Sequence, residues 1–188
     1  MAIQQVLREY NLGAGATLRA LEERLFEAAA AEARPRIAAA SAAGAAGDAG
    51  GPLRLLETYV RPEWIDYNGH MTDSRYLQVF GDATDALFRY AGIDEAYRHS
   101  GRALYTAESH LLHKAEAHSQ ERLYVTSRIV EVDEKRVRLL HRMHRTRDDA
   151  LLATVEQVYL HVDTVRGRVA PMDTAVRTRL AAIQTATR

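Results

Sequence analysis

Cysteine is absent from the 188 residues of the chain. Without thiols there are no disulfides, no thiolate metal ligands and no cysteine nucleophile. Long apolar runs are also missing: none approaches the roughly 20 residues that a helix needs to cross a bilayer. Residues 1–30 lack the basic start and the apolar stretch of a signal peptide. We therefore expect a cytoplasmic protein that has no membrane partner.

The chain has no excess of charge of either sign. Lys plus Arg and Asp plus Glu both number 25, so the formal net charge is zero. Proteins that bind nucleic acid or anionic membranes usually carry a basic excess. The charge balance therefore gives no reason to expect nucleic acid as a partner.

Residues 1–52 differ in character from the rest of the chain. Helical spacing of apolar residues is visible near both ends of 3–26, but the segment is interrupted at Gly13 and Gly15. An alanine-rich stretch follows and becomes dense in glycine before Pro52. Such composition buries little apolar area and is typical of a linker. We expect an N-terminal helical extension and linker over 1–52, and one folded domain over 53–188.

One long helix is predicted in the folded domain. Thr72 and Asp73 are natural N-cap residues, and Gly92 is a suitable stop. Between them, apolar or small residues recur at steps of three and four, which predicts one buried face. The members of that face are Leu77, Phe80, Thr84, Leu87, Phe88 and Ala91.

Extended segments surround the helix in the sequence. Residues 53–60 precede it, and four runs with alternating apolar residues follow it. These runs are 103–113, 122–132, 136–146 and 151–162. Short polar turns at 133–135 and 147–149 predict antiparallel neighbours. We expect a polar connection at 96–101, a turn at 165–171 and a C-terminal helix over 174–183.

This order of elements predicts an α+β hotdog fold, in which a five-stranded antiparallel sheet wraps around one long central helix. A single sheet of this kind leaves its second face and its edges exposed. Pairing with another copy would cover them, so we expect a homo-oligomer, at least a dimer.

The loop ahead of the helix carries the best candidate for chemistry. Asp66 lies a few residues before a helix N-terminus, where unpaired amides and the positive end of the dipole point outward. A carboxylate can activate a nucleophile while such amides hold an oxyanion. Equally, Asp66 could cap the amides of Asn68 or Gly69 in a turn.

The segment Asp66-Tyr67-Asn68-Gly69-His70 and the helix residue Tyr76 resemble the hotdog-fold acyl-CoA thioesterases of the 4-hydroxybenzoyl-CoA thioesterase type. The similarity covers about 53–165. It implies an acyl-CoA substrate, a catalytic Asp66, and an oxyanion donor at the backbone amide of Asp73. A thioester is already activated, so we expect no cofactor.

Within that family, residues 62–72 and 79–87 are most similar to the thioesterases of bacterial carnitine breakdown, often fused behind L-carnitine dehydrogenase. Residues 12–25 are similar to the end of such a dehydrogenase. The resemblance implies hydrolysis of betainyl-CoA to glycine betaine and CoA, with a carnitine dehydrogenase module as a partner.

Other residues near the loop have two interpretations each. His70 orients the reacting groups or holds the loop, and Asn68 forms the turn or positions water. Gly69 provides a backbone shape that allows close approach of the substrate. Some hotdog thioesterases carry their carboxylate on the helix, which makes Asp82 the reserve candidate.

Four aromatic residues are candidates for binding the quaternary ammonium group of such a substrate through cation–π attraction. They are Trp64, Tyr67, Tyr76 and Tyr105. Ordinary packing is the alternative for each of them. Glu108 and His110 share one face of a strand and could line the acyl pocket.

We expect no metal site from the histidine spacing. His110 with His113, and His141 with His144, lie three residues apart, and on strands this spacing puts the two rings on opposite faces. Two other functions stay open. One is an enoyl-CoA hydratase on the same fold, although its motif has five residues between Asp and His, whereas three lie between Asp66 and His70. The other is a non-catalytic acyl-CoA-binding module.

Overall fold

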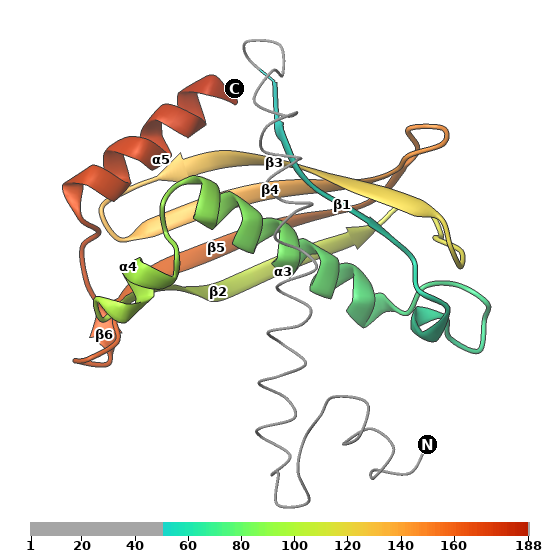
Figure 1. Ribbon diagram of the computed structural model, residues 1–188, viewed down its shortest axis with the longest axis horizontal. Helices are drawn as coiled ribbons and strands as arrows, with labels where there is room; N and C mark the ends of the chain where they lie inside the picture. The colour runs from blue at the N-terminus through green and yellow to red at the C-terminus, as the bar shows by residue number, and fades with distance from the viewer. Residues whose placement is uncertain (1–50, 188) are drawn as a thin grey trace, which may run out of the picture. The chain divides into compact units, whose positions relative to one another are not determined.

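A computed structural model describes residues 51–187, and in it one antiparallel sheet curls around a long helix (Figure 1). The strands of the sheet are β1 (Leu53–Tyr59), β2 (Arg102–His113), β3 (Arg122–Val132), β4 (Arg136–Arg145), β5 (Leu151–Asp163) and β6 (Arg168–Val169). The helices are the 3₁₀ turn η1 (Pro62–Trp64), α3 (Asp73–Tyr90), α4 (Glu95–His99) and α5 (Thr174–Ala186). The α+β hotdog architecture is confirmed.

The sheet has the strand order β1-β3-β4-β5-β2, with β6 paired to the end of β5. Every pairing is antiparallel, as the short polar turns predicted. The β3–β4 turn leaves Val132 opposite Val137, and the register shifts once along the pair, between Ile129 and Glu131. Within the described chain, β1 and β2 form the two edges of the sheet.

Helix α3 lies across one face of the sheet because one stripe of its surface is apolar. Tyr76, Phe80, Ala83 and Leu87 are buried at steps of three and four. Leu77 fits the same spacing, but its side chain is 41% exposed, so its expected burial is wrong. Leu77 follows the buried Tyr76 in the sequence and lies at the border of the apolar stripe, where its side chain reaches solvent.

Three local expectations need correction. The segment 96–101 is not a plain connection: it contains most of α4, which begins where the Asp94 carboxylate accepts a hydrogen bond from the Tyr97 amide at 3.0 Å. The turn at 165–171 includes β6, which adds a sixth, two-residue strand to the five expected. The C-terminal helix extends to Ala186 rather than ending at 183.

The expected boundary at residue 52 is not tested, because the extension over 1–50 lies outside the described residues. Among 51–187, no helix combines the length and apolar character that crossing a membrane requires.

A buried polar network joins α3 to the sheet. The Thr84 hydroxyl oxygen lies 3.1 Å from Nε2 of His141 and 3.0 Å from the Tyr159 hydroxyl, and Nδ1 of His141 lies 2.7 Å from Oγ of Ser127. Both ring nitrogens of His141 therefore have partners in the core. Burial lowers the pKa of His141 from 6.5 to about 3, so the ring is neutral at neutral pH.

This network predicts acid sensitivity. Between pH 6.5 and about 3, His141 takes up a proton only in the unfolded chain, so the free energy of unfolding should fall as the pH is lowered through that window. Above pH 6.5 the residue contributes no slope. Urea unfolding at a series of pH values measures this slope. In His141→Gln the slope of the free energy of unfolding against pH should be smaller by the contribution of about one proton, about 1.4 kcal/mol per pH unit.

The exposed His99 in α4 provides the matched control. His99→Gln should retain the wild-type slope. Equal slopes for wild type and His141→Gln would contradict the neutral buried state of His141.

Candidate active site

The loop between β1 and α3 is a closed turn built around Asp66. The Asp66 amide donates to the His70 carbonyl at 2.9 Å, and the Gly69 amide donates to the Asp66 carbonyl at 3.0 Å. Gly69 has φ +83°, a left-handed conformation that a side chain would strain. No atom lies within 4 Å of the position that a Cβ on Gly69 would occupy, so the space beside it is open.

Asp66 itself is half-buried, and one of its carboxylate oxygens accepts a hydrogen bond from the Asn68 amide at 2.8 Å. Asp66 therefore does cap an amide of its own turn, as one of its two interpretations predicted. The second carboxylate oxygen has no hydrogen-bond partner within 51–187. This arrangement fixes the carboxylate and leaves one oxygen for a reacting group.

The start of α3 keeps an unpaired amide beside this loop. The Thr72 side chain does not cap the helix, because its hydroxyl donates to the Trp64 carbonyl at 3.0 Å instead. The Ser74 amide is taken by the Asp73 carboxylate at 2.6 Å. The Asp73 amide has no partner in the described part of the chain. An N–H group at the positive end of the dipole is thus available to an oxyanion.

Tyr76 anchors this region rather than facing open space. Its buried hydroxyl accepts a hydrogen bond from the Ala117 amide at 3.1 Å, and its ring packs edge-on against His113 at 4.7 Å between centroids. The Ala117 carbonyl in turn accepts from the Met71 amide at 2.8 Å. Burial raises the pKa of the Tyr76 hydroxyl, so it stays protonated. The β2–β3 connection is thereby tied to the loop.

The four aromatic candidates do not form one cluster within a single chain. Trp64 is buried, and the guanidinium groups of Arg61 and Arg75 lie 5.4 and 6.0 Å from its ring. Tyr67 is 97% exposed on the loop, and Tyr105 is 56% exposed on β2. Trp64 thus packs in the core of this chain, whereas Tyr67 and Tyr105 are exposed, and the binding of a cation by any of them stays a prediction.

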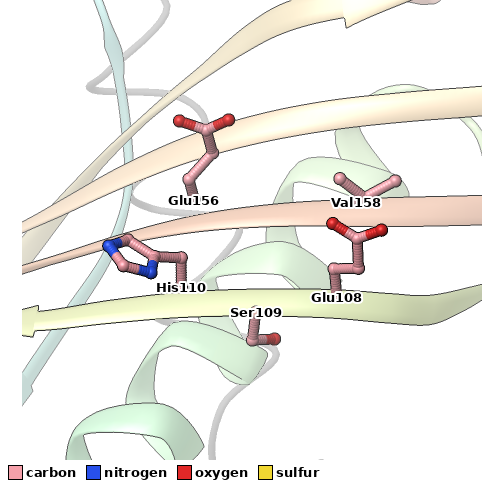
Figure 2. A pocket seen from close by; sticks show the side chains of 5 residues that line it. All are labelled: Glu108, Ser109, His110, Glu156 and Val158. Atoms are coloured by element: carbon pink, nitrogen blue, oxygen red, sulfur yellow. The ribbon is translucent and has the colours of Figure 1, made fainter.

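Glu108 lies on the other face of the sheet from α3. Its neighbour Ser109 accepts a hydrogen bond from Gln157, which also contacts Thr84 of the helix, so Ser109 points to the helix side. Side chains alternate along a strand, so Glu108 and His110 point away. Both line a pocket of about 540 Å³ together with Glu156 (Figure 2). No lining residue of that pocket comes from the Asp66 loop.

His70 contacts a carboxylate, but not that of Asp66. Its Nε2 lies 3.0 Å from Oε2 of Glu116, and its ring meets that of His118 edge-on, with centroids 5.0 Å apart. Sequence reasoning missed Glu116 and His118 because they lie almost 50 residues beyond His70 and have no characteristic spacing with it. His110 and His113 do lie on opposite faces, as their spacing predicts: His113 meets α3, whereas His110 lies on the far face of the sheet.

The reserve candidate Asp82 lies on the exposed side of α3. Partial burial raises the pKa of its carboxyl, and the neighbouring Asp85 raises it further. Asp82 therefore offers a carboxyl group on the helix, but it lacks the turn that fixes the carboxylate of Asp66.

Comparison with known proteins agrees with this architecture. Residues 60–180 match the family model described as the thioesterase-like superfamily. A protein of Rhizobium meliloti (strain 1021) named L-carnitine dehydrogenase/betainyl-CoA thioesterase is 40% identical over 168 residues, covering 89% of this chain and 32% of its own length. The chain thus spans about a third of that relative.

Shorter relatives align over most of their length. The betainyl-CoA thioesterase of Pseudomonas aeruginosa is 39% identical over 137 residues, covering 72% of this chain and 86% of its own. A putative thioesterase of Pseudomonas putida KT2440 is 33% identical with a TM-score of 0.62, over 71% of this chain and 85% of that one. A Staphylococcus aureus protein solved in complex with CoA shares the fold alone, with 23% identity and a TM-score of 0.69 over 76% of this chain and 90% of its own.

Sequence, fold and loop geometry thus lead to one assignment: the chain belongs to the thioesterase-like superfamily.

Proposed function

We propose that the chain hydrolyses betainyl-CoA to glycine betaine and CoA. The observation that carries this proposal is the half-buried Asp66 carboxylate in the loop just ahead of α3. Among residues 51–187, one of its oxygens and the amide at the start of α3 have no hydrogen-bond partner. The relatives named betainyl-CoA thioesterase support the choice of acyl group. Since CoA esters are made inside the cell, we place the activity in the cytoplasm.

The proposed reaction uses the two groups on the thioester carbonyl. The Asp73 amide donates a hydrogen bond to the carbonyl oxygen and stabilises the negative charge that develops there. Asp66 either attacks the carbonyl carbon, giving an anhydride that water then opens, or removes a proton from attacking water. In both routes the C–S bond breaks, and CoA leaves as a thiolate that takes up a proton.

The neighbouring residues have supporting roles in this proposal. Asn68 and Gly69 form the turn that fixes the Asp66 carboxylate, and His70 holds the loop through Glu116. Tyr76 fixes the start of α3, and Trp64 packs beneath the loop. Glu108, on the opposite face of the sheet, has no role in this site.

A second copy of the chain would complete the site. Strand β2 is a 12-residue edge with exposed apolar side chains, among them Tyr105 and Leu112. An exposed edge of this length is a natural template for pairing with another strand. A dimer, or a tetramer built from dimers, would cover β2 and add aromatic surface near the acyl group.

We further propose that residues 1–52 are the end of a carnitine dehydrogenase module and its linker. The relative from Rhizobium meliloti, whose name joins both activities, aligns over 89% of this chain, and so over part of this segment.

The catalytic proposal predicts that Asp66→Asn loses thiol release. The amide keeps the size of the carboxylate, but it can neither attack the thioester nor accept a proton from water, so kcat should fall at least a hundredfold. Release of CoA from betainyl-CoA, followed with a thiol reagent, measures the effect.

A matched control is Asp149→Asn. Asp149 lies in the β4–β5 turn at φ +58°, a conformation that asparagine tolerates, and this substitution should leave turnover intact. Full activity in a folded Asp66→Asn protein would exclude Asp66 as the catalytic group. Tight binding of CoA esters with no thiol release by the wild type would favour the non-catalytic module.

The choice of acyl group predicts a preference for positive charge. 3,3-Dimethylbutyryl-CoA has the shape of betainyl-CoA with carbon in place of nitrogen. One desolvated cation–π contact is worth about 2 kcal/mol, so kcat/KM should favour betainyl-CoA by roughly thirtyfold. Equal values for the two esters would contradict recognition of the cation, and hydration of crotonyl-CoA would favour the hydratase alternative.

The proposed pairing along β2 predicts a particle of at least twice the 21.0 kDa of one chain. Sedimentation equilibrium at micromolar concentration measures this mass. A monomer that still releases CoA at the full rate would contradict a site completed by a second copy.

A further inference from the structure

His70, Glu116 and His118 form a compact group beside the Asp66 loop. One ring nitrogen from each histidine and one carboxylate oxygen of Glu116 all lie within 4.8 Å of one another. Two imidazoles and one carboxylate are a ligand set that Zn²⁺ binds, with the fourth position open to water. Ligand atoms about 2.0 Å from a tetrahedral ion lie roughly 3.3 Å apart. Small side-chain rotations would bring the three ligand atoms from their present separations, all within 4.8 Å, to that spacing.

The backbone around the group is rigid without help from these three side chains. The Met71 amide, next to His70, donates to the Ala117 carbonyl at 2.8 Å, and the Ala117 amide donates to the Tyr76 hydroxyl at 3.1 Å. The His118 amide donates to the Glu121 carboxylate at 3.0 Å. Ala117 is fully buried, while Glu116 and His118 on either side of it are exposed. Fixed main chain of this kind holds the potential ligands together before any ion binds.

A hydrogen bond between His70 and Glu116 explains only two members of the group. Their 3.0 Å contact needs no third residue. The ring of His118 has no hydrogen-bond partner within 51–187, yet it lies against the ring of His70. A shared ion accounts for all three side chains.

We propose that His70, Glu116 and His118 bind one divalent transition-metal ion of the Zn²⁺ class, which clamps the loop containing Asp66 to the β2–β3 connection. Imidazole nitrogen favours Zn²⁺ and its neighbours over Mg²⁺ and Ca²⁺, which prefer sets made of oxygen ligands. His70 is also the residue that holds the Asp66 loop in the proposed hydrolysis, but metal binding and thiol release are measured independently, so either assignment can fail without the other.

The test is calorimetric titration of the full chain, first treated with a chelator and then dialysed, with ZnCl₂ and with MgCl₂. Wild type should bind one Zn²⁺ per chain and unfold at a higher temperature with Zn²⁺ present, because the ion binds the folded state. MgCl₂ should have no effect. His118→Ala and Glu116→Ala should bind Zn²⁺ at least roughly tenfold more weakly, since loss of even an outer partner of a metal ligand has that effect.

His99→Ala removes an exposed histidine outside the group and should bind Zn²⁺ as wild type does. Circular dichroism without metal shows whether each variant is folded, and a Co²⁺ titration of wild type should give visible absorption that His118→Ala lacks. No binding by wild type, or equal Zn²⁺ affinity in wild type and folded His118→Ala, would overturn the proposal. Thiol release measured on the same samples reports separately on the proposed hydrolysis.

Discussion

Ala117 makes two hydrogen bonds that join the Asp66 loop, the β2–β3 connection and the start of α3. Its carbonyl accepts from the amide of Met71, and its amide donates to the hydroxyl of Tyr76. Ala117 and both partners are buried, where water cannot replace a lost bond. Since Met71 ends the Asp66 loop and Tyr76 lies in the first turn of α3, these bonds make the loop, the helix start and the β2–β3 connection one unit.

The start of α3 lies within that unit and keeps polar groups available. A capping side chain usually accepts from the second or third amide of a helix, but the hydroxyl of Thr72 donates to the carbonyl of Trp64 instead. The Asp73 amide, the first of the helix, has no partner among residues 51–187. One carboxylate oxygen of Asp66 likewise accepts a hydrogen bond from the Asn68 amide in its own turn, and the other oxygen has no partner within 51–187. Polar groups fixed before the substrate arrives need little reorganisation when charge develops, which is the main electrostatic advantage of an active site.

Local patterns predicted the fold well because the long elements α3, β3, β4 and β5 each bury a set of side chains. The predicted strand 122–132 and polar turn 133–135 have the bounds of β3 and of the turn to β4, and the predicted alternation holds as far as Ile129, where the register shifts. The predicted burial of Leu77 was wrong because periodicity cannot tell the middle of an apolar stripe from its border. The Asp66 turn was predictable from its own sequence, whereas the approach of Glu116 and His118 to His70 depends on how the sheet brings two distant loops together.

The central claim is that the thioester carbonyl lies between Asp66 and the amide of Asp73. A crystal structure with a non-hydrolysable betainyl-CoA analogue, its sulfur replaced by a methylene group, tests this directly. The account predicts the ketone oxygen within hydrogen-bond distance of the Asp73 amide and the carbonyl carbon facing Asp66. An acyl group bound instead beside Glu108 and His110, on the far face of the sheet, would contradict it.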